Sequence, residues 1–255
     1  MTSLLDYIKN MSVDSKSLKG KTMAKDLIIK PPFFEIGPKA FMYGDDVVKL
    51  AIFCDQMVKK YDVRIILTPQ YTDIYRCAQA TTDVLVFAQH MDPIKIGRGL
   101  GSVLPEAVKA AGAKGVMLNH AERPISLAEL NKSIKRADEL GLATIVCAES
   151  PEEAQAIAHL GPNIIIAEQT QLIGTGESPD YSYISESIKL VKSINPNIGV
   201  LPGAGIKNGK DVYDVIMAGA EGTGSTSGIM KAQDPLAMVE EMISAVRLAW
   251  DTRHK

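Results

Sequence analysis

The sequence has few cysteines, and the three present form no recognisable pattern. Cys54, Cys77 and Cys147 are odd in number, and none belongs to a C-x-x-C pair. A disulfide framework needs paired cysteines, and a structural zinc site needs closely spaced ligands. The sequence therefore predicts buried free thiols in a reducing compartment and no structural zinc site.

An excess of charge of one sign is missing, and so are long apolar runs. The formal net charge is -2 over 255 residues, so the basic surface that nucleic-acid binding requires is not expected. No apolar run approaches the roughly 20 residues of a membrane span, and the N-terminus lacks the pattern of a secretory signal. We expect a cytoplasmic protein with no nucleic-acid partner and no membrane partner.

Short apolar runs alternate with amphipathic stretches along most of the chain. Continuous apolar runs favour parallel strands covered on both faces, and eight strand-helix units suit a closed barrel. We predict an α/β fold, a (β/α)8 TIM barrel over residues 31–255, preceded by an extension of helix and linker over residues 1–30. The predicted strands are 33–37, 63–68, 84–89, 115–119, 142–147, 163–168, 198–203 and 221–226.

Helix starts support this reading of the chain. The stretch SLAELNKSIKRADELG follows Pro124, and SPEEAQAIAHLG places Glu153 three residues after Ser150. A serine followed by glutamate at this spacing is the pattern of a capping box. The segment DLIIK, which ends at Lys30 before two prolines, is assigned to the approach to the barrel.

Three ionisable residues stand at or just beyond predicted strand ends, where barrels of this kind place their chemistry. They are Lys39, His120 and Glu168. Each alone fits a structural role: a solvated lysine, a loop histidine or a salt-bridged carboxylate. Glu168 ends a strongly apolar strand, and burying a carboxylate is costly unless it is paired or its raised pKa is useful. A base, an electrophile and a cation on one rim suit proton transfer next to a carbonyl.

Glycine-rich turns follow the last three predicted strands. They are IGTGES, PGAGIKNG and GSTSGI, and they include Gly174, Gly203 and Gly228. Barrels bind phosphate at this position through backbone N–H groups and a helix N-terminus. Three such turns on adjacent loops indicate a small phosphorylated ligand.

Several ordered segments carry a family resemblance: AQHMDPIKIG, GSVLPEAVKAAGAKGVMLNHAERP, Glu168 with the following LIGTG, GAGI and SGIMKAQDP. Through them the chain resembles the triosephosphate isomerase family, particularly its shorter archaeal-type form, over about residues 33–245. The resemblance implies that Lys39 is the cationic group, His120 the neutral electrophile and Glu168 the base. Glu122 would be the structural glutamate beside the histidine.

The implied reaction converts dihydroxyacetone phosphate to glyceraldehyde 3-phosphate through an enediol, without a metal or other cofactor. This would place the enzyme in glycolysis and gluconeogenesis. The resemblance also implies a loop, QTQLIGTG, that closes over the substrate, and a homodimer or homotetramer assembled through DPIKIGRGLGS. The implied contacts to substrate and phosphate come from Gly37, Gly174, Gly203, Ala204, Ser227 and Gly228.

The sequence departs from the family pattern at several of these positions. The family's N-x-K is Gly37-Pro38-Lys39 here, and the threonine that reaches this amide from a neighbouring subunit is replaced at Leu100. The serine after the histidine is Ala121, and the proline after the glutamate is Gln169. More space at Gly37 and altered polarity nearby would admit a longer substrate.

Other functions stay open at this point. One is isomerisation of another short keto-sugar phosphate, such as a four-carbon erythrulose phosphate. Another is a barrel that binds a phosphorylated metabolite without turnover, although a pure binder has no need for the base Glu168. A Schiff-base aldolase is disfavoured, because no predicted strand carries an interior lysine.

Overall fold

Eight parallel strands form the centre of the protein. The computed structural model describes residues 29–168, 181–203 and 205–255. The sheet order is β7-β6-β5-β4-β3-β2-β1-β8, and β7 and β8 also contact each other, so the strands close into a barrel. The strands are β1 Phe33–Ile36, β2 Arg64–Leu67, β3 Leu85–Ala88, β4 Gly115–Leu118, β5 Ala143–Ala148, β6 Ile164–Ala167, β7 Gly199–Pro202 and β8 Gly222–Ser225.

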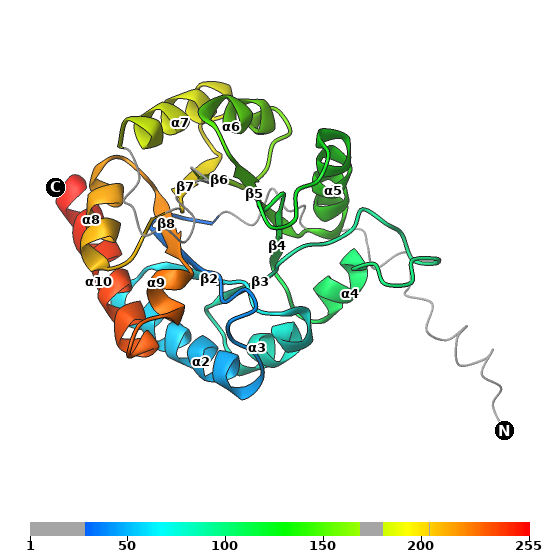
Figure 1. Ribbon diagram of the computed structural model, residues 1–255, viewed down its shortest axis with the longest axis horizontal. Coiled ribbons are helices and arrows are strands. Elements are labelled where there is room, and N and C mark those ends of the chain that lie inside the picture. The colour runs from blue at the N-terminus through cyan, green and yellow to red at the C-terminus, as the bar shows by residue number, and fades with distance from the viewer. Residues whose placement is uncertain (1–28, 169–180, 204) are drawn as a thin grey trace.

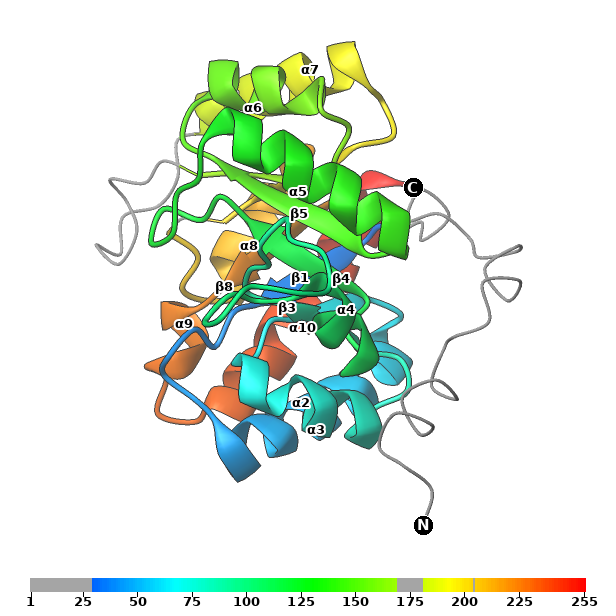
Figure 2. The same cartoon turned by 90° about the vertical axis from the view of Figure 1, so that its right-hand side faces the viewer.

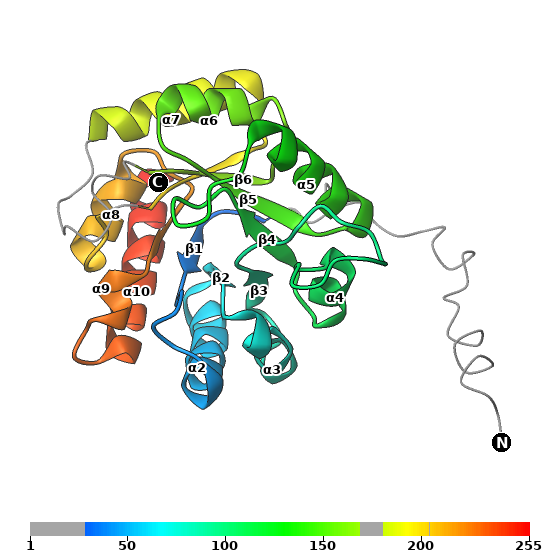
Figure 3. The same ribbon diagram turned by 45° about the vertical axis from the view of Figure 1, so that its right-hand side comes forward.

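Helices alternate with these strands and surround them (Figure 1). Figure 2 shows α2 and α3 on one side of the barrel and α6 and α7 on the opposite side. In Figure 3 α8, α9 and α10 lie side by side, and α10 contacts both of the others. The helices are α2 Gly44–Tyr61, α3 Ile74–Ala80, α4 Pro105–Ala110, α5 Leu127–Leu140, α6 Pro151–Ala158, α7 Tyr181–Ile194, α8 Gly209–Met217, α9 Ser227–Met230 and α10 Pro235–Arg253, with a 3-10 turn at Tyr71–Asp73.

The predicted (β/α)8 barrel is confirmed, and each strand lies in its predicted run, with only β5 extending one residue further. Of the predicted extension over residues 1–30, all but Ile29 and Lys30 lies outside the described residues. The predicted closing loop QTQLIGTG also lies outside them, as does Gly174. None of the helices in the described ranges combines the length and hydrophobicity that a membrane crossing requires.

The strand side chains pack into two separate layers, because successive side chains of a strand point to opposite faces. Phe34 and Ile36 belong to the outer core between strands and helices. Phe33 belongs to a second core inside the barrel, together with residues such as Phe87 and Ile145. The burial of β1 on both faces agrees with its apolar sequence, and it directs Glu35 to the same side as Phe33.

The predicted helix starts are largely confirmed. The Oγ atoms of Ser126 and Ser150 accept hydrogen bonds from the N–H groups three residues later, at Glu129 and Glu153. The Glu153 carboxylate, however, accepts from the N–H of Glu149 at 2.7 Å and not from that of Ser150. The return bond of the predicted capping box is therefore formed one residue earlier in the chain.

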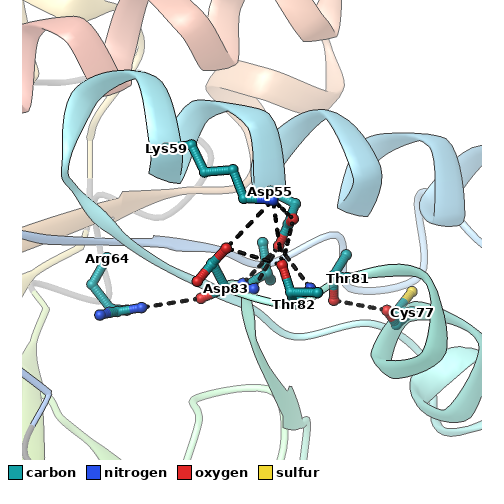
Figure 4. A network of polar contacts seen from close by, with 8 residues as sticks. Asp55, Lys59, Arg64, Cys77, Thr81, Thr82 and Asp83 are labelled. Carbon is teal, nitrogen blue, oxygen red and sulfur yellow. Dashed lines mark hydrogen bonds and ion pairs between the residues drawn. The ribbon is translucent and has the colours of Figure 1, made fainter.

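A buried carboxylate joins α2 to the segment before β3 (Figure 4). Asp55 accepts hydrogen bonds from the N–H groups of Thr82, Asp83 and Val84, and from the Lys59 ammonium. Burial favours a raised pKa for Asp55, but these donors outweigh it and lower the pKa below its ordinary value. The cysteines are free and buried, as predicted.

Candidate active site

A cavity of about 340 Å³ opens at the carboxyl ends of the strands. Its walls come from strand ends and from the loops that follow them, as in other barrels of this architecture. Lys39, His120 and Glu168 all line it, so the structure brings the three predicted ionisable residues together. Further lining residues are Glu35, Gly37, Thr68, Gln70, Gln89, Glu122, Arg123, Gly203, Lys207, Thr226 and Ser227.

Glu168 is held at the end of β6. Its N–H donates to the carbonyl oxygen of Ala148 at 3.0 Å, which extends the pairing with β5 by one residue. Burial raises the pKa of Glu168, while the positive charge of Lys39 lowers it and the negative charge of Glu122 raises it. The net result is a carboxylate that is more basic than an exposed glutamate, as a general base requires.

His120 is held in one tautomer by the backbone. Its Nδ1 lies 3.0 Å from the N–H of Glu122, which can only donate a hydrogen bond. Nδ1 must therefore accept, and the ring proton lies on Nε2. Burial lowers the pKa of His120, and the nearby positive charge of Lys39 lowers it further. The ring is thus a neutral imidazole whose Nε2–H can donate to a ligand.

Asn119 fixes the start of the histidine loop. Its backbone has a φ of 57°, in the left-handed region that asparagine tolerates better than most residues. Its Nδ2 donates to the carbonyl oxygen of Cys147 at 3.0 Å, and its Oδ1 accepts from the N–H of Ile125 at 3.1 Å. The side chain thereby ties the loop after β4 to β5.

Lys39 also has a left-handed backbone, with a φ of 48°. Its carbonyl oxygen accepts from the Nε2 atoms of Gln70 and Gln89, at 2.7 and 3.1 Å. Its Nζ lies 2.7 Å from Glu122 Oε1, and 65% of the Glu122 side chain is exposed. The two amides hold the strained backbone, whereas the exposed ion pair contributes little and can be exchanged for a ligand.

The predicted phosphate-binding residues are placed differently from one another. Gly203 and Ser227 line the cavity, and Ser227 begins α9. Gly228 lies behind them: a Cβ there would stand 2.7 Å from both the Ile206 carbonyl oxygen and Ser225 Oγ. It therefore permits close packing between the loops after β7 and β8. Ala204, like Gly174, lies outside the described residues.

Gly203 has a steric role that its sequence context does not show. A Cβ at this position would lie 2.3 Å from Oε1 of Glu168. The Glu168 carboxylate therefore occupies space that glycine leaves free.

Sequence reasoning missed several residues of the site. Gln70, Gln89 and Asn119 carry no local signal of their role, and the cations Lys207 and Arg123 also line the cavity. Glu35 did have a signal, since it is a charge in the middle of the apolar strand FFEIG. Only 6% of it is exposed. Its pKa is raised to about 7 overall: burial raises it most, a hydrogen bond from Thr68 lowers it, and the charge of Glu168 raises it.

Glu35 is expected to make the stability of the protein depend on pH. Its pKa rises from 4.5 in the unfolded chain to about 7 in the fold. Its stabilising contribution is therefore present below pH 4.5 and is lost as the pH rises through 7. The shift corresponds to roughly 3 kcal/mol of unfolding free energy that depends on pH. The Glu35→Gln variant should lack this pH dependence. Denaturant titrations at pH 4.5 and pH 8 measure this, with the exposed Glu186→Gln as control. If the unfolding free energies of wild type and Glu35→Gln differed by the same amount at both pH values, this expectation would be wrong.

The cavity thus joins a basic carboxylate, a neutral imidazole and a lysine at one end of a parallel barrel, and known proteins are similar to this chain in sequence. The family model described as Triosephosphate isomerase matches residues 39–243. The triosephosphate isomerase of Methanobacterium bryantii is 39% identical over 206 residues, which cover 80% of this chain and 91% of that protein. That of Saccharolobus solfataricus is 38% identical over 221 residues, covering 85% and 97%. The predicted resemblance is confirmed, and the chain belongs to the triosephosphate isomerase family.

Proposed function

We propose that this member of the family interconverts dihydroxyacetone phosphate and glyceraldehyde 3-phosphate through an enediol. The observation that supports this most directly is that one cavity holds all three groups. Glu168 is a basic carboxylate, His120 is neutral with its proton on Nε2, and Lys39 supplies a cation. Proton transfer beside a carbonyl needs a base together with donors to the oxygen that becomes negative.

In this mechanism Glu168 removes the proton from the carbon next to the substrate carbonyl. The Nε2–H of His120 and the ammonium group of Lys39 stabilise the negative charge that develops on the oxygen. His120 gives its Nε2 proton to the carbonyl oxygen and takes up the proton of the neighbouring hydroxyl, and Glu168 returns the carbon-bound proton to the neighbouring carbon, which completes the isomerisation. Lys39 is able to turn from Glu122 to the substrate because that ion pair is exposed and weak.

The phosphate group is proposed to bind between the loops after β7 and β8. Gly203 and Ser227 come from these two loops and line the cavity, and Ser227 begins the short helix α9. Backbone N–H groups at this position bind phosphate in many barrels. Lys207 and Arg123 line the same cavity and add positive charge for a dianionic ligand.

A direct assay tests the proposal. Purified protein is supplied with either triose phosphate, and formation of the other is followed with a coupled dehydrogenase in both directions. The reaction is repeated in D2O, where the enediol step should introduce deuterium at the carbon that is reprotonated. We expect turnover in both directions and deuterium in the product. Saturable binding of the triose phosphates without turnover would instead favour a non-catalytic, metabolite-binding barrel.

A further inference from the structure

The Glu35 carboxyl is a buried polar group that the proposed proton transfer does not use. It projects from β1 into the barrel and lines the cavity of the active site. Its Oε1 accepts a hydrogen bond from Thr68 Oγ1 at 2.8 Å. Within the described ranges this is the one hydrogen bond to the carboxyl, so its capacity to bind a further donor is unused. Buried carboxyls normally have more partners than this.

Gly37, Thr68 and Thr226 line the cavity beside this carboxyl, and we call this part of the cavity the recess at Gly37. A Cβ on Gly37 would stand 3.1 Å from Glu35 Oε1, 3.2 Å from Thr226 Oγ1 and 3.4 Å from Thr68 Oγ1. Three side-chain oxygens therefore surround the space that a side chain at residue 37 would fill. Gly37 does not have a positive φ, so its backbone does not require glycine, and what glycine provides here is space.

A second glycine makes room for the carboxyl on its other side. Gly224 pairs with Glu35 across the β1–β8 boundary. A Cβ on Gly224 would lie 2.8 Å from the Glu35 carbonyl oxygen and 3.1 Å from Oε2. Large apolar side chains fill this layer elsewhere in the barrel, whereas here the two glycines make room for a carboxyl in the wall of the cavity.

The chemistry of the recess selects one kind of ligand group. A carboxylate accepts hydrogen bonds, and the hydroxyls of Thr68 and Thr226 both donate and accept. A phosphate would be repelled by the carboxylate, and an apolar group would leave the buried oxygens unsatisfied. An alcohol satisfies both requirements, because it donates to the carboxylate and accepts from a threonine hydroxyl.

We propose that Glu35 and Thr226 bind an additional hydroxyl of the substrate in the recess at Gly37, so that the site turns over a four-carbon keto-sugar phosphate with a higher kcat/KM than the three-carbon one. This inference rests on the proposed isomerase function and defines its substrate class. Glu35 is here a specificity residue, since it contacts a hydroxyl that does not react. A four-carbon substrate carries one more hydroxyl than dihydroxyacetone phosphate, and the same cavity holds Lys39, His120 and Glu168.

The test compares kcat/KM for dihydroxyacetone phosphate with kcat/KM for the 1- and 4-phosphates of erythrulose at pH 8, above the pKa of Glu35, where its carboxylate is ionised. Glu35→Leu removes the carboxylate at similar size and should lower kcat/KM for the preferred four-carbon substrate roughly 30-fold, the usual effect of losing a hydrogen bond to a charged group. The value for the three-carbon substrate should change less than about threefold, because that substrate has no group in the recess. Gly37→Ala should produce the same selective loss by narrowing the recess.

Controls separate this inference from general damage to the site. Glu186→Gln on the exposed face of α7 should leave both values unchanged. Circular dichroism checks that each variant folds. If Glu35→Leu does not fold, the two kcat/KM values are compared in Gly37→Ala. Equal losses for both substrate lengths, or a wild-type preference for the three-carbon substrate, would overturn the inference while leaving the isomerase function intact. Absence of turnover with every substrate would overturn both.

Discussion

Replacing Glu168 with glutamine is expected to lower kcat by roughly 10³-fold, within the range that general bases contribute, while KM changes only a few-fold. Glutamine has nearly the same size and hydrogen-bonding reach, but it cannot accept the proton from carbon. The loss therefore falls on the transition state and not on substrate binding. Glu168→Asp keeps the charge but withdraws the carboxylate by about one methylene, and a displacement of this size is expected to cost about 10²-fold.

Steady-state kinetics with the preferred substrate measure these losses. Glu149→Gln is a matched control, because it removes an exposed carboxylate one residue beyond β5 on the same rim. It should retain wild-type kcat. A Glu168→Gln variant that loses kcat/KM through KM alone would show that this residue binds substrate and is not the base.

The pH profile of the wild-type enzyme should report the same group. Glu168 must be deprotonated to act, and burial raises its pKa above the ordinary 4.5. Activity should therefore be low in acid and rise with pH through an apparent pKa above 4.5. Burial and the positive charge of Lys39 lower the pKa of His120 below its ordinary 6.5, which favours the neutral ring over the same rise.

The second large effect is expected from Gly203→Ala, which should lower kcat/KM roughly 10²-fold with little loss of stability. The new Cβ would stand 2.3 Å from Glu168 Oε1, which is closer than non-bonded atoms approach, and 3.2 Å from its Cδ. The atom in the way is the end of a movable side chain, so Glu168 shifts and the fold does not. A base that is displaced by about 1 Å no longer meets the substrate carbon correctly.

Gly199→Ala is the matched control, on β7 in the same segment of chain. Its Cβ would lie 3.2 Å from Ile164 Cγ1 and Phe33 Cζ, in the barrel core and away from the cavity. This variant should lose stability but keep its turnover per folded molecule. Kinetics and thermal unfolding of both variants test the contrast. If Gly203→Ala were fully active, or if both variants lost only stability, the packing of Glu168 against Gly203 would not matter for catalysis.

The pattern of apolar residues was sufficient to predict the barrel. The barrel in turn predicts which residues gather at the carboxyl ends of the strands. The runs FFEI, GVML and IIIA are buried along their whole length, as continuous apolar strands should be. Parallel strands of one barrel end at the same rim, so residues just beyond three of them must share a site. This is why the sequence was sufficient to predict that Lys39, His120 and Glu168 lie together.

The supporting residues could not be found in the same way, because their partners are distant in sequence. Gln89 binds the Lys39 carbonyl across 50 residues, and Gln70 binds it across 31. Neither glutamine differs locally from a solvated loop residue. Similarly, nothing near Gly203 in the sequence shows that the Glu168 carboxylate fills the space over it.

The sequence by itself determined which residues form strands and which ionisable groups stand at their ends, because both follow from the local order of apolar and polar residues. The tertiary structure alone decided the surroundings of each group: the tautomer of His120, the space beside Glu168, and the recess around Glu35. These depend on distances of a few ångströms between chain segments that meet only when the barrel closes.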